Sequence, residues 1–328
     1  MTKARLDVLA IGDAIVDVIA STDDEFLTAE RLVKGSMRLI DADEATRLYS
    51  HMGQARETSG GSAANTMAGI AAMGGRAGFV GQVSADQLGE IFAHDIHALG
   101  VEYETKPLDT AAPTGRCLIL VTPDGQRTMN TFAGASHQLS AAALDPEQIA
   151  DAAILYLEAY LWVPDGPRAA MLEAIDIAKA AGRKVALTLS DIACIDKRRD
   201  SFVDLIKGDG LDLLFANEAE ILSLTGEREF ERAVAVFADK VPLLVVTCSE
   251  KGAVAIERGR RVHVPAARVD KVVDTTGAGD LFAAGFLFGQ AEGRSLEDCL
   301  RIGSLCAAEI ISHFGARPEA DLKALVAA

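Results

Sequence analysis

The chain has 328 residues, of which 49% are hydrophobic, enough to bury one large α/β domain or a domain with an appendage. A formal net charge of −16 argues against nucleic acid or an anionic membrane as a partner. The five scattered cysteines lack metal-type spacing and suit reduced thiols, and we find neither a signal peptide nor an apolar run that spans a bilayer, so we expect a cytoplasmic protein.

The first half of the chain mixes expected strands and helices without a regular alternation. In chain order, we expect a strand over 6–18 interrupted by Gly12 and Asp13, a helix over 63–73, a strand over 78–83, a helix over 87–99 that ends at Gly100, and hairpin strands over 116–122 and 126–131. The hairpin is expected because Pro123-Asp124-Gly125 is a turn sequence between two apolar runs.

From about residue 150 the pattern changes to short apolar strands that alternate with helices. The strands are expected over 154–157, 184–188, 211–215 and 243–247, with helices such as 166–181 and 229–238 between them. This alternation predicts an α/β fold: three layers, with a doubly wound, mostly parallel sheet between helices. The early hairpin segments do not fit, and we interpret residues of about 13–20, 35–43 and 105–134 as a small β-sheet lid on a single domain over 1–328.

The most informative segment is Asp274-Thr275-Thr276-Gly277-Ala278-Gly279-Asp280, which an apolar run follows at once. Small residues at 277–279 let backbone N–H groups approach a ligand, and a helix that begins there adds the positive end of its dipole. An anion-binding turn beside the Asp280 carboxylate suits phosphoryl transfer to an alcohol, which needs stabilised phosphate charge and a base. For a bare Gly-Ala-Gly, the alternative is an ordinary helix N-terminus after a flexible turn.

Three further segments stand before this one: Ser59-Gly60-Gly61-Ser62-Ala63-Ala64-Asn65, Asn217-Glu218-Ala219-Glu220, and the run from Val245 to Gly252. Together, in this order, the four segments resemble those of the ribokinase-type (phosphofructokinase-B) kinases along nearly the whole chain. The resemblance implies a ribokinase-like fold, ATP as phosphoryl donor and Mg²⁺ as cofactor. It also leaves open a monovalent cation such as K⁺.

Within that family the chain looks most like the adenosine kinases. The similarity rests on Gly12 to Asp17, on 33–43, on Pro113-Thr114-Gly115-Arg116-Cys117 and on 213–218. Asp13 departs from the pattern, because adenosine kinases commonly carry asparagine there, and Glu158 stands where we expect a small residue. Other sugar kinases of the family share some of these features.

The resemblance implies that the acceptor sugar is held by Asp17, Asn65 and the turn Gly60-Gly61-Ser62. A carboxylate with an amide is also the pair that best holds a vicinal diol. Asp13 is expected to influence the choice of sugar or base, although a strand-end turn residue is the alternative for both aspartates. Tyr160 is expected to stack on a base, and core packing explains it equally well.

On the nucleotide side, Arg127 is expected to neutralise phosphate charge as the lid closes, the alternative being a solvated hairpin residue. Asn217 and Glu220 are expected to act on Mg²⁺ through water. The same two residues also form a capping-box pattern at a helix start, and both interpretations can hold together. The remaining ATP contacts implied by the resemblance are Thr247, Ser249 (where the family more often has glycine), Gly252, Thr275, Thr276, Gly277, Gly279 and Ala307.

We therefore expect ATP-dependent phosphorylation of the 5′-hydroxyl of a nucleoside, adenosine first, with Asp280 as general base. A free sugar such as ribose or fructose, or guanosine or inosine, is the nearest alternative acceptor, and a sensor that binds without turnover is another class. An NAD-dependent dehydrogenase is disfavoured because Gly12-Asp13-Ala14-Ile15 lacks a Gly-x-Gly-x-x-Gly turn. The lid sheet either pairs with a second subunit or is closed by its own fifth strand, and we favour a monomer over a homodimer.

Overall fold

Two separate β-sheets organise the chain. The structure is a computed structural model that describes residues 4–327, and over these residues the strands form a nine-stranded and a five-stranded sheet. The order in the large sheet is β14-β13-β12-β11-β10-β9-β1-β5-β6, parallel throughout except where β13 pairs with β12 and β14. Its strands are β1 (Leu6–Ile11), β5 (Ala77–Val80), β6 (Glu102–Tyr103), β9 (Ala152–Glu158), β10 (Lys184–Thr188), β11 (Leu213–Asn217), β12 (Leu243–Thr247), β13 (Ala253–Glu257) and β14 (Arg260–Val264).

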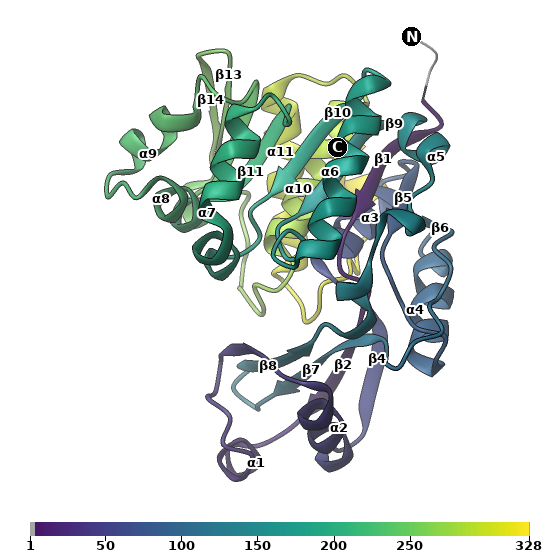
Figure 1. Cartoon of the computed structure of the whole chain (residues 1–328). Coiled ribbons are helices and arrows are strands. Elements are labelled where there is room, and N and C mark those ends of the chain that lie inside the picture. Colours follow the sequence, from purple (N-terminus) through teal and green to yellow (C-terminus); the bar gives the residue numbers. More distant parts are fainter. Residues whose placement is uncertain (1–3, 328) are drawn as a thin grey trace.

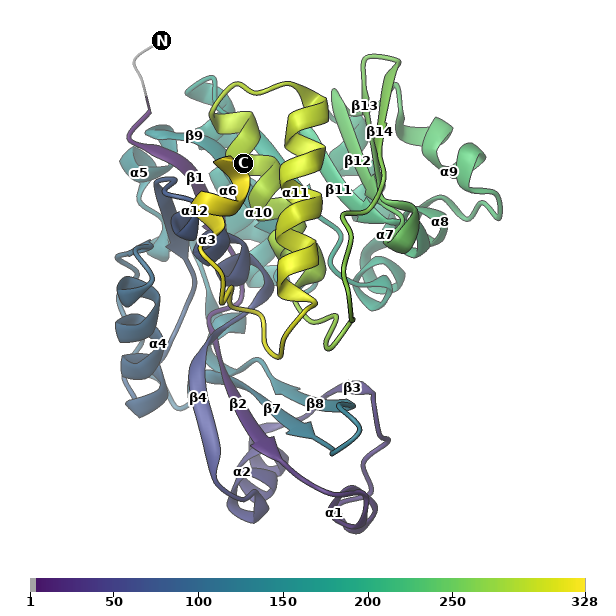
Figure 2. The same cartoon turned by 180° about the vertical axis from the view of Figure 1, so that it is seen from behind.

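Helices cover both faces of the large sheet, which confirms the expected three layers (Figures 1 and 2). The face seen in Figure 1 carries α5 (Pro146–Ala150), α6 (Asp165–Ala180), α7 (Ile192–Lys207), α8 (Glu218–Thr225) and α9 (Phe230–Phe237). The opposite face carries α3 (Ser62–Ala72), α4 (Gln87–Ala98), α10 (Ala278–Ala291), α11 (Leu296–Ile310) and α12 (Leu322–Ala327). No helix within residues 4–327 combines the length and apolarity needed to cross a bilayer.

The core is divided by the sheet because successive strand residues point to opposite faces. In β1, Val8 and Ala10 are fully buried on the α3 and α10 side, whereas Leu9 and Ile11 are fully buried on the α6 side. A strand buried on both faces has a nearly continuous apolar sequence, which is why the sequence pattern revealed these strands.

The small sheet forms the lid, in the order β3-β8-β7-β2-β4. Its elements are β2 (Ile15–Ser21), α1 (Asp24–Ala29), β3 (Met37–Leu39), α2 (Ala42–His51), β4 (Ala55–Gly60), β7 (Gly115–Val121) and β8 (Arg127–Phe132). The structure adds β4 to the segments expected from the sequence, and α1 and α2 pack on one face of this sheet. The expected hairpin is present, as β7 paired antiparallel with β8.

The interruption expected at Gly12 and Asp13 is present, and the two parts of the strand expected over 6–18 belong to different sheets: the chain leaves the large sheet after Ile11 and enters the lid at Ile15. Gly12 makes this passage possible: a Cβ built on it would lie 2.5 Å from the Ala63 Cβ and 2.8 Å from the Glu158 carboxyl carbon. The turn therefore lies directly against α3 and β9.

The strand order reverses between β1 and β9. From β1 the chain adds β5 and β6 on one side, and from β9 it adds β10, β11 and β12 on the other. In open parallel sheets, ligands bind at the carboxyl ends of the strands near such a reversal. Gly12 follows β1 and Glu158 is the last residue of β9, and the ends of strands β1 and β9 point toward the lid in Figure 1.

Candidate active site

The Gly277–Gly279 turn leads into α10 with one side open. Gly277 has φ +77°, the left-handed conformation that favours glycine, and its hypothetical Cβ would lie 3.0 Å from the Ala316 Cβ. A Cβ built on Gly279 would meet nothing within 4 Å, and within residues 4–327 no backbone carbonyl accepts the Gly279 N–H. The Ala278 N–H, by contrast, donates to the Thr275 carbonyl oxygen at 3.2 Å. The Gly277 N–H likewise has no acceptor within residues 4–327, so Gly277 and Gly279 carry the open N–H groups of the expected anion hole.

Asp280 follows in the first turn of α10, and α3 supplies its hydrogen-bond donors. Ser62 Oγ donates to one carboxylate oxygen at 2.6 Å and Asn65 Nδ2 donates to the other at 2.9 Å. Burial raises the pKa of the Asp280 carboxyl, while these two donors and the Arg317 charge oppose the rise. Both donors leave lone pairs on the carboxylate, so it can still accept a proton from a bound hydroxyl.

Gly60 and Gly61, just before α3, allow the backbone there to lie in close contact with Asp13 and Asp17. Gly61 has φ +99°, and a Cβ there would lie 2.1 Å from the Asp13 carbonyl oxygen. A Cβ on Gly60 would lie 2.5 Å from the Asp17 carboxyl carbon. The expected Gly60-Gly61 turn and the two aspartates thus form one cluster.

Asp17 presents an unpartnered carboxylate from β2. Within the described part of the chain, no side-chain or backbone donor is hydrogen-bonded to it. Burial raises its pKa to about 6, against the opposing charges of Arg317 and Arg127. A group in this state has free acceptor capacity for ligand hydroxyls.

Asp13 and Glu158 are two neighbouring acids at the point where the strand order of the large sheet reverses. Glu158 is fully buried and accepts the backbone N–H groups of Asp13 and Ala63, both at 2.6 Å. The Asp13 carboxylate accepts a hydrogen bond from Ser136 Oγ, and burial raises the pKa of both acids. Glu158, which stands where we expected a small residue, therefore links the segment after β1 to the start of α3 through hydrogen bonds.

Arg127 joins the lid to the segment before α10. Its Nη2 lies 2.7 Å from Asp274 Oδ2, and the two side chains are only 7% and 6% exposed. The guanidinium also lies over the Phe314 ring, with 5.8 Å between its carbon and the ring centroid. The interpretation of Arg127 as a solvated hairpin residue is wrong.

Arg317 is a residue of the cluster that the sequence analysis missed. It lies in the segment between α11 and α12 and donates from Nη2 to the Ser59 carbonyl oxygen at 2.7 Å and from Nη1 to Asn65 Oδ1. A single arginine near the end of the chain, outside any motif, carries no spacing signal that points to this place.

On the nucleotide side, Asn217 and Thr247 end the neighbouring strands β11 and β12 and are paired in register. Asn217 Oδ1 accepts the Glu220 N–H at 2.8 Å, and Glu220 accepts the Asn217 N–H at 2.9 Å, which confirms the capping box. Burial raises the pKa of Glu220 to about 7.

Backbone geometry explains two other expected nucleotide residues. Ser249 has φ +50°, a conformation that favours glycine and accounts for the glycine usual at this position in the family it resembles. A Cβ on Gly252 would lie 2.0 Å from the Val264 carbonyl oxygen, so the close passage of β14 alone requires glycine there.

The remaining expected residues lie around the same edge. Thr276 donates from its backbone N–H and from Oγ1 to Asp274 Oδ1, at 3.0 and 2.8 Å, and Thr275 forms the turn with Ala278. Ala307 is partly buried on α11. Tyr160 is partly buried beyond the end of β9 and packs against the core on the α6 side, and burial together with Asp191 raises the pKa of its hydroxyl.

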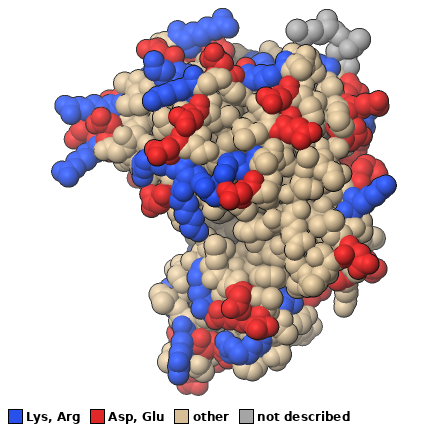
Figure 3. Space-filling model, in the orientation of Figure 1, with Lys and Arg blue, Asp and Glu red and all other residues tan. Residues whose placement is uncertain are grey.

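A largely apolar cavity of about 330 Å³ adjoins the Asp13 side of the cluster. Its lining residues come from β3 and its flank, from the segment before β7, from β8 and its flank, and from the 3₁₀ helix η1 (Gly134–Gln138), and they are Leu39, Ile40, Ala112, Thr131, Phe132, Ala133, Gly134 and His137. Ser136 of the same 3₁₀ helix donates to Asp13, and the charge of His137 acts on that carboxyl. Figure 3 shows that the surface is hollowed between the lid and the main body.

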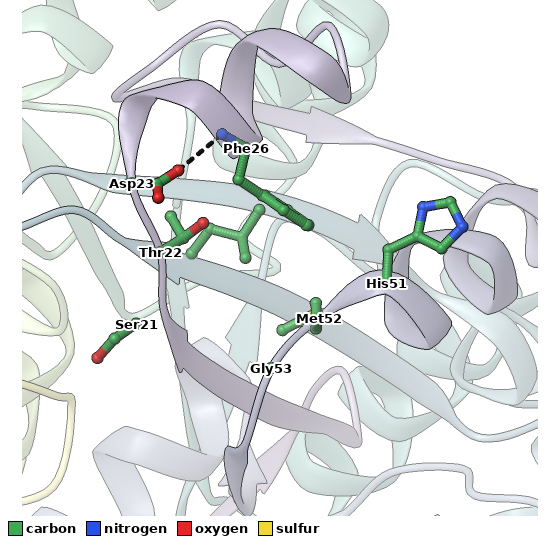
Figure 4. A pocket seen from close by; sticks show the side chains of 8 residues that line it. Ser21, Thr22, Asp23, Phe26, His51, Met52 and Gly53 are labelled. Carbon is green, nitrogen blue, oxygen red and sulfur yellow. Dashed lines mark hydrogen bonds between the residues drawn. The ribbon is translucent and has the colours of Figure 1, made fainter.

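A second pocket, of about 390 Å³, lies at the far end of β2 from Ile15 (Figure 4). It is lined by Ser21, Thr22, Asp23, Phe26, His51, Met52, Gly53 and Leu120. Asp23 accepts the Phe26 N–H at 2.8 Å as the N-cap of α1. None of the expected site residues lines this pocket.

A divalent cation has no preformed cage in the described residues, because no group of three or more His, Cys, Asp or Glu side chains there could hold a metal ion. Mg²⁺ usually keeps several waters and takes one or two carboxylates together with substrate phosphates. The capping box leaves lone pairs on the Glu220 carboxylate that can accept from metal-bound water. This donor set fits Mg²⁺ that arrives with a nucleotide.

Solved structures match this architecture over almost the whole chain. A probable sugar kinase from Rhizobium etli CFN 42 has a TM-score of 0.92 and 48% identity, covering 98% of this chain and 97% of that chain. The adenosine kinase from Sinorhizobium meliloti has a TM-score of 0.91 and 49% identity, covering 98% of each chain.

Curated relatives are more distant and differ in their named substrates. An ATP-dependent ribose-1-phosphate kinase from Halopiger xanaduensis is 32% identical over 289 residues, covering 87% of this chain and 90% of the relative. Probable fructokinase-4 from Arabidopsis thaliana is 28% identical over 274 residues, covering 79% and 83%. The family profile that matches residues 6–322 is that of the pfkB family carbohydrate kinases.

Proposed function

Because the chain belongs to the pfkB family of carbohydrate kinases, we propose that it transfers the γ-phosphoryl group of ATP to the 5′-hydroxyl of a nucleoside, adenosine first. The similarity to the Sinorhizobium meliloti adenosine kinase, at 49% identity over 98% of each chain, supports a nucleoside acceptor. The similarity to fructokinases makes a free sugar the alternative.

The observation that carries the nucleoside is the cavity beside Asp13. An acceptor sugar held by Asp17 and Asn65 would leave this space of about 330 Å³ unfilled, whereas the base of a nucleoside would bury its apolar lining. Ser136, in the same 3₁₀ helix as the lining residues Gly134 and His137, donates to Asp13, and the carboxylate of Asp13 keeps lone pairs that can accept a hydrogen bond from a heterocycle.

In the proposed reaction, Asp280 accepts the proton of the 5′-hydroxyl as the oxygen attacks the γ-phosphorus. Ser62 and Asn65 hold its carboxylate in place, and their hydrogen bonds favour the ionised form that acts as base. The N–H groups of the 277–279 turn, above all those of Gly277 and Gly279, stabilise charge on the transferred phosphoryl group. The lid excludes water, so that ATP is not hydrolysed before the acceptor binds.

ATP brings the metal to this site. Asn217 and Glu220 would hold Mg²⁺ through water, and the ion would neutralise phosphate charge while the transfer takes place. Arg127 would supply further positive charge from the lid side, in exchange for its contact with Asp274.

A phosphorylated acceptor is disfavoured by the charge of the pocket. Asp13, Asp17 and Asp280 surround the proposed acceptor position, Arg317 is already tied to Ser59 and Asn65, and Arg127 would be engaged by the phosphates of ATP. A sugar phosphate would place a dianion against these carboxylates, which is unfavourable at close range. We therefore propose a neutral acceptor, in contrast to the ribose 1-phosphate named for the Halopiger relative.

Coupled ADP release with Mg-ATP tests the proposal against adenosine, guanosine, inosine, ribose, fructose and ribose 1-phosphate. We expect the highest kcat/KM with adenosine and negligible turnover with ribose 1-phosphate. A higher kcat/KM for ribose or fructose would overturn the nucleoside and keep the kinase chemistry. Turnover of ribose 1-phosphate would overturn the charge argument.

A further inference from the structure

Arg317 reaches the catalytic cluster from the segment that follows α11. Its Nη2 donates to Ser59 Oγ at 3.0 Å as well as to the Ser59 carbonyl oxygen at 2.7 Å, and Nη1 donates to Asn65 Oδ1. Its Nε is buried without a partner. Both terminal nitrogens of Arg317 are thus hydrogen-bonded, one to Ser59 and one to Asn65, which contacts the proposed base.

The contact with Asn65 decides how its carboxamide points. Arginine donates hydrogen bonds and accepts none, so the amide oxygen of Asn65 must face Arg317. The amide nitrogen is then directed at Asp280 Oδ2, to which it donates at 2.9 Å. With the amide reversed, its NH₂ group would face the guanidinium and its oxygen would face the Asp280 carboxylate, two repulsive contacts.

Arg317 also supplies positive charge among acids. Its own pKa is lowered by burial, and Asp17, Asp95 and Asp280 oppose that change. Around Asp280, Arg317 is the cation that favours the carboxylate form. The titratable groups that also feel the charge of Asp280 come from β2, from β9 and from the segment after it, and they are Asp17, Tyr156, Glu158 and Tyr160.

Asp95 holds Ser59, the residue with which Arg317 forms two hydrogen bonds. Asp95 of α4 accepts the Ser59 N–H at 2.8 Å and the Ser59 hydroxyl at 2.6 Å, which fixes the residue that Arg317 grips. A continuous chain of hydrogen bonds therefore runs from α4 through Ser59, Arg317 and Asn65 to the proposed base.

We propose that Arg317 is a positioning residue for phosphoryl transfer: it locks the Asn65 amide toward Asp280 and keeps that carboxylate ionised and oriented. The kinetic part of this inference rests on the proposed function. The hydrogen-bond chain itself is a property of the protein without substrate.

The kinetic test compares Arg317→Met and Arg317→Lys with the wild type, using whichever acceptor of the panel the wild type turns over. Arg183→Met is the matched control, because Arg183 Nε also holds a backbone carbonyl, that of Ala150 at 2.6 Å, outside the cluster. We expect Arg317→Met to lower kcat roughly tenfold to hundredfold, as misplaced catalytic groups do, with little change in the KM for ATP.

The pH profile separates positioning from stability. Without the guanidinium the acid limb of kcat should move to higher pH by about one unit, because an opposite charge is lost and the Asn65 amide is no longer held toward the carboxylate. Arg317→Lys should restore the limb, since it keeps the charge, without restoring kcat in full, since one ammonium cannot replace the fork of donors. Arg183→Met should change neither quantity. An unchanged acid limb in folded Arg317→Met would overturn the proposal.

A thermal-melting cycle gives a readout that needs no substrate. The loss of Tm caused by Arg317→Met is measured in the wild-type and in the Asp280→Asn background at pH 7. Because Arg317 compensates the charge of Asp280, the loss should be smaller in the Asp280→Asn background. Equal losses would show that Arg317 only fills space, and that result would overturn the inference even if no acceptor in the panel is phosphorylated.

Discussion

The buried pair of Arg127 and Asp274 predicts an unequal response to the loss of either partner. Removing one member of a buried ion pair typically costs about 3–5 kcal/mol, because the other charge is left uncompensated. The surroundings of the two side chains differ, however, and this difference decides which substitution costs more.

Asp274 keeps partners when the arginine is lost. Its carboxylate still accepts the Thr276 N–H at 3.0 Å, the Thr276 hydroxyl at 2.8 Å and the Gly315 N–H at 3.0 Å. Arg127→Met should therefore reduce the free energy of unfolding by only about 1–3 kcal/mol, the range for a lost charged hydrogen bond.

Arg127 retains fewer interactions when the Asp274 carboxylate is removed. Its Nε is already buried without a partner, and Asp274→Ala would also strip the acceptor from Thr276 and Gly315. We expect this substitution to cost about 3–5 kcal/mol or more.

Urea unfolding without nucleotide measures both costs, followed by the fluorescence of Trp162, the single tryptophan, which is 1% exposed. Arg261→Met is the control, because its pair with Glu231 is 43% and 68% exposed and should cost at most about 1 kcal/mol. An Arg127→Met cost that equals or exceeds the Asp274→Ala cost would refute the reasoning.

Three further predictions concern the proposed acceptor site. Asp280→Asn should lower kcat by about two or more orders of magnitude, the usual loss for a general base, and coupled ADP release that stays within tenfold of the wild type would contradict this. The KM for the acceptor should fall as pH rises through about 6, where Asp17 ionises, and a series of KM values should lose this dependence in Asp17→Asn. Gly61→Ala should destabilise the protein more than Gly226→Ala in urea unfolding, because its Cβ would lie 2.1 Å from a carbonyl oxygen whereas nothing lies within 4 Å at Gly226. Equal costs for the two alanines would show that the close approach to Asp13 is relieved without strain.

The raised pKa of Asp17 also predicts how the stability of the protein depends on pH. The pKa of Asp17 is raised from 3.8 to about 6 in the folded protein, so the folded state binds the proton more tightly than the unfolded state does. The contribution of Asp17 to stability is therefore present at low pH and is lost as pH rises from about 3.8 to about 6. Asp17→Asn should remove this loss, which urea unfolding at pH 4 and pH 7 would detect.

The sequence predicted the elements whose residues are buried on both faces. The expected strands over 184–188 and 243–247 coincide with β10 and β12, because these runs are continuous apolar segments between helices. The β4 strand was not predicted because its sequence, Ala55-Arg56-Glu57-Thr58-Ser59-Gly60, is mostly polar and lies at the edge of the lid. Such a strand is specified by its partner β2 and hardly by its own pattern.

Among the proposed site residues, the glycine turns and Asp280 could be proposed from the sequence because their chemistry depends on local sequence. The interruption at Gly12 and Asp13 was also expected, but the need for glycine there was not, since only the distant residues Ala63 and Glu158 explain it. Arg317 was missed for the same reason: its proposed role follows from contacts with Ser59 and Asn65, more than 250 residues earlier in the chain.

The measurement that tests the central claim most directly is analysis of the product formed from adenosine and Mg-ATP. The account predicts AMP and ADP in equal amounts from the wild type, the phosphate on the 5′-oxygen by ³¹P and ¹H NMR, and almost none from Asp280→Asn. ADP formed without AMP, or AMP formed equally fast by Asp280→Asn, would contradict it.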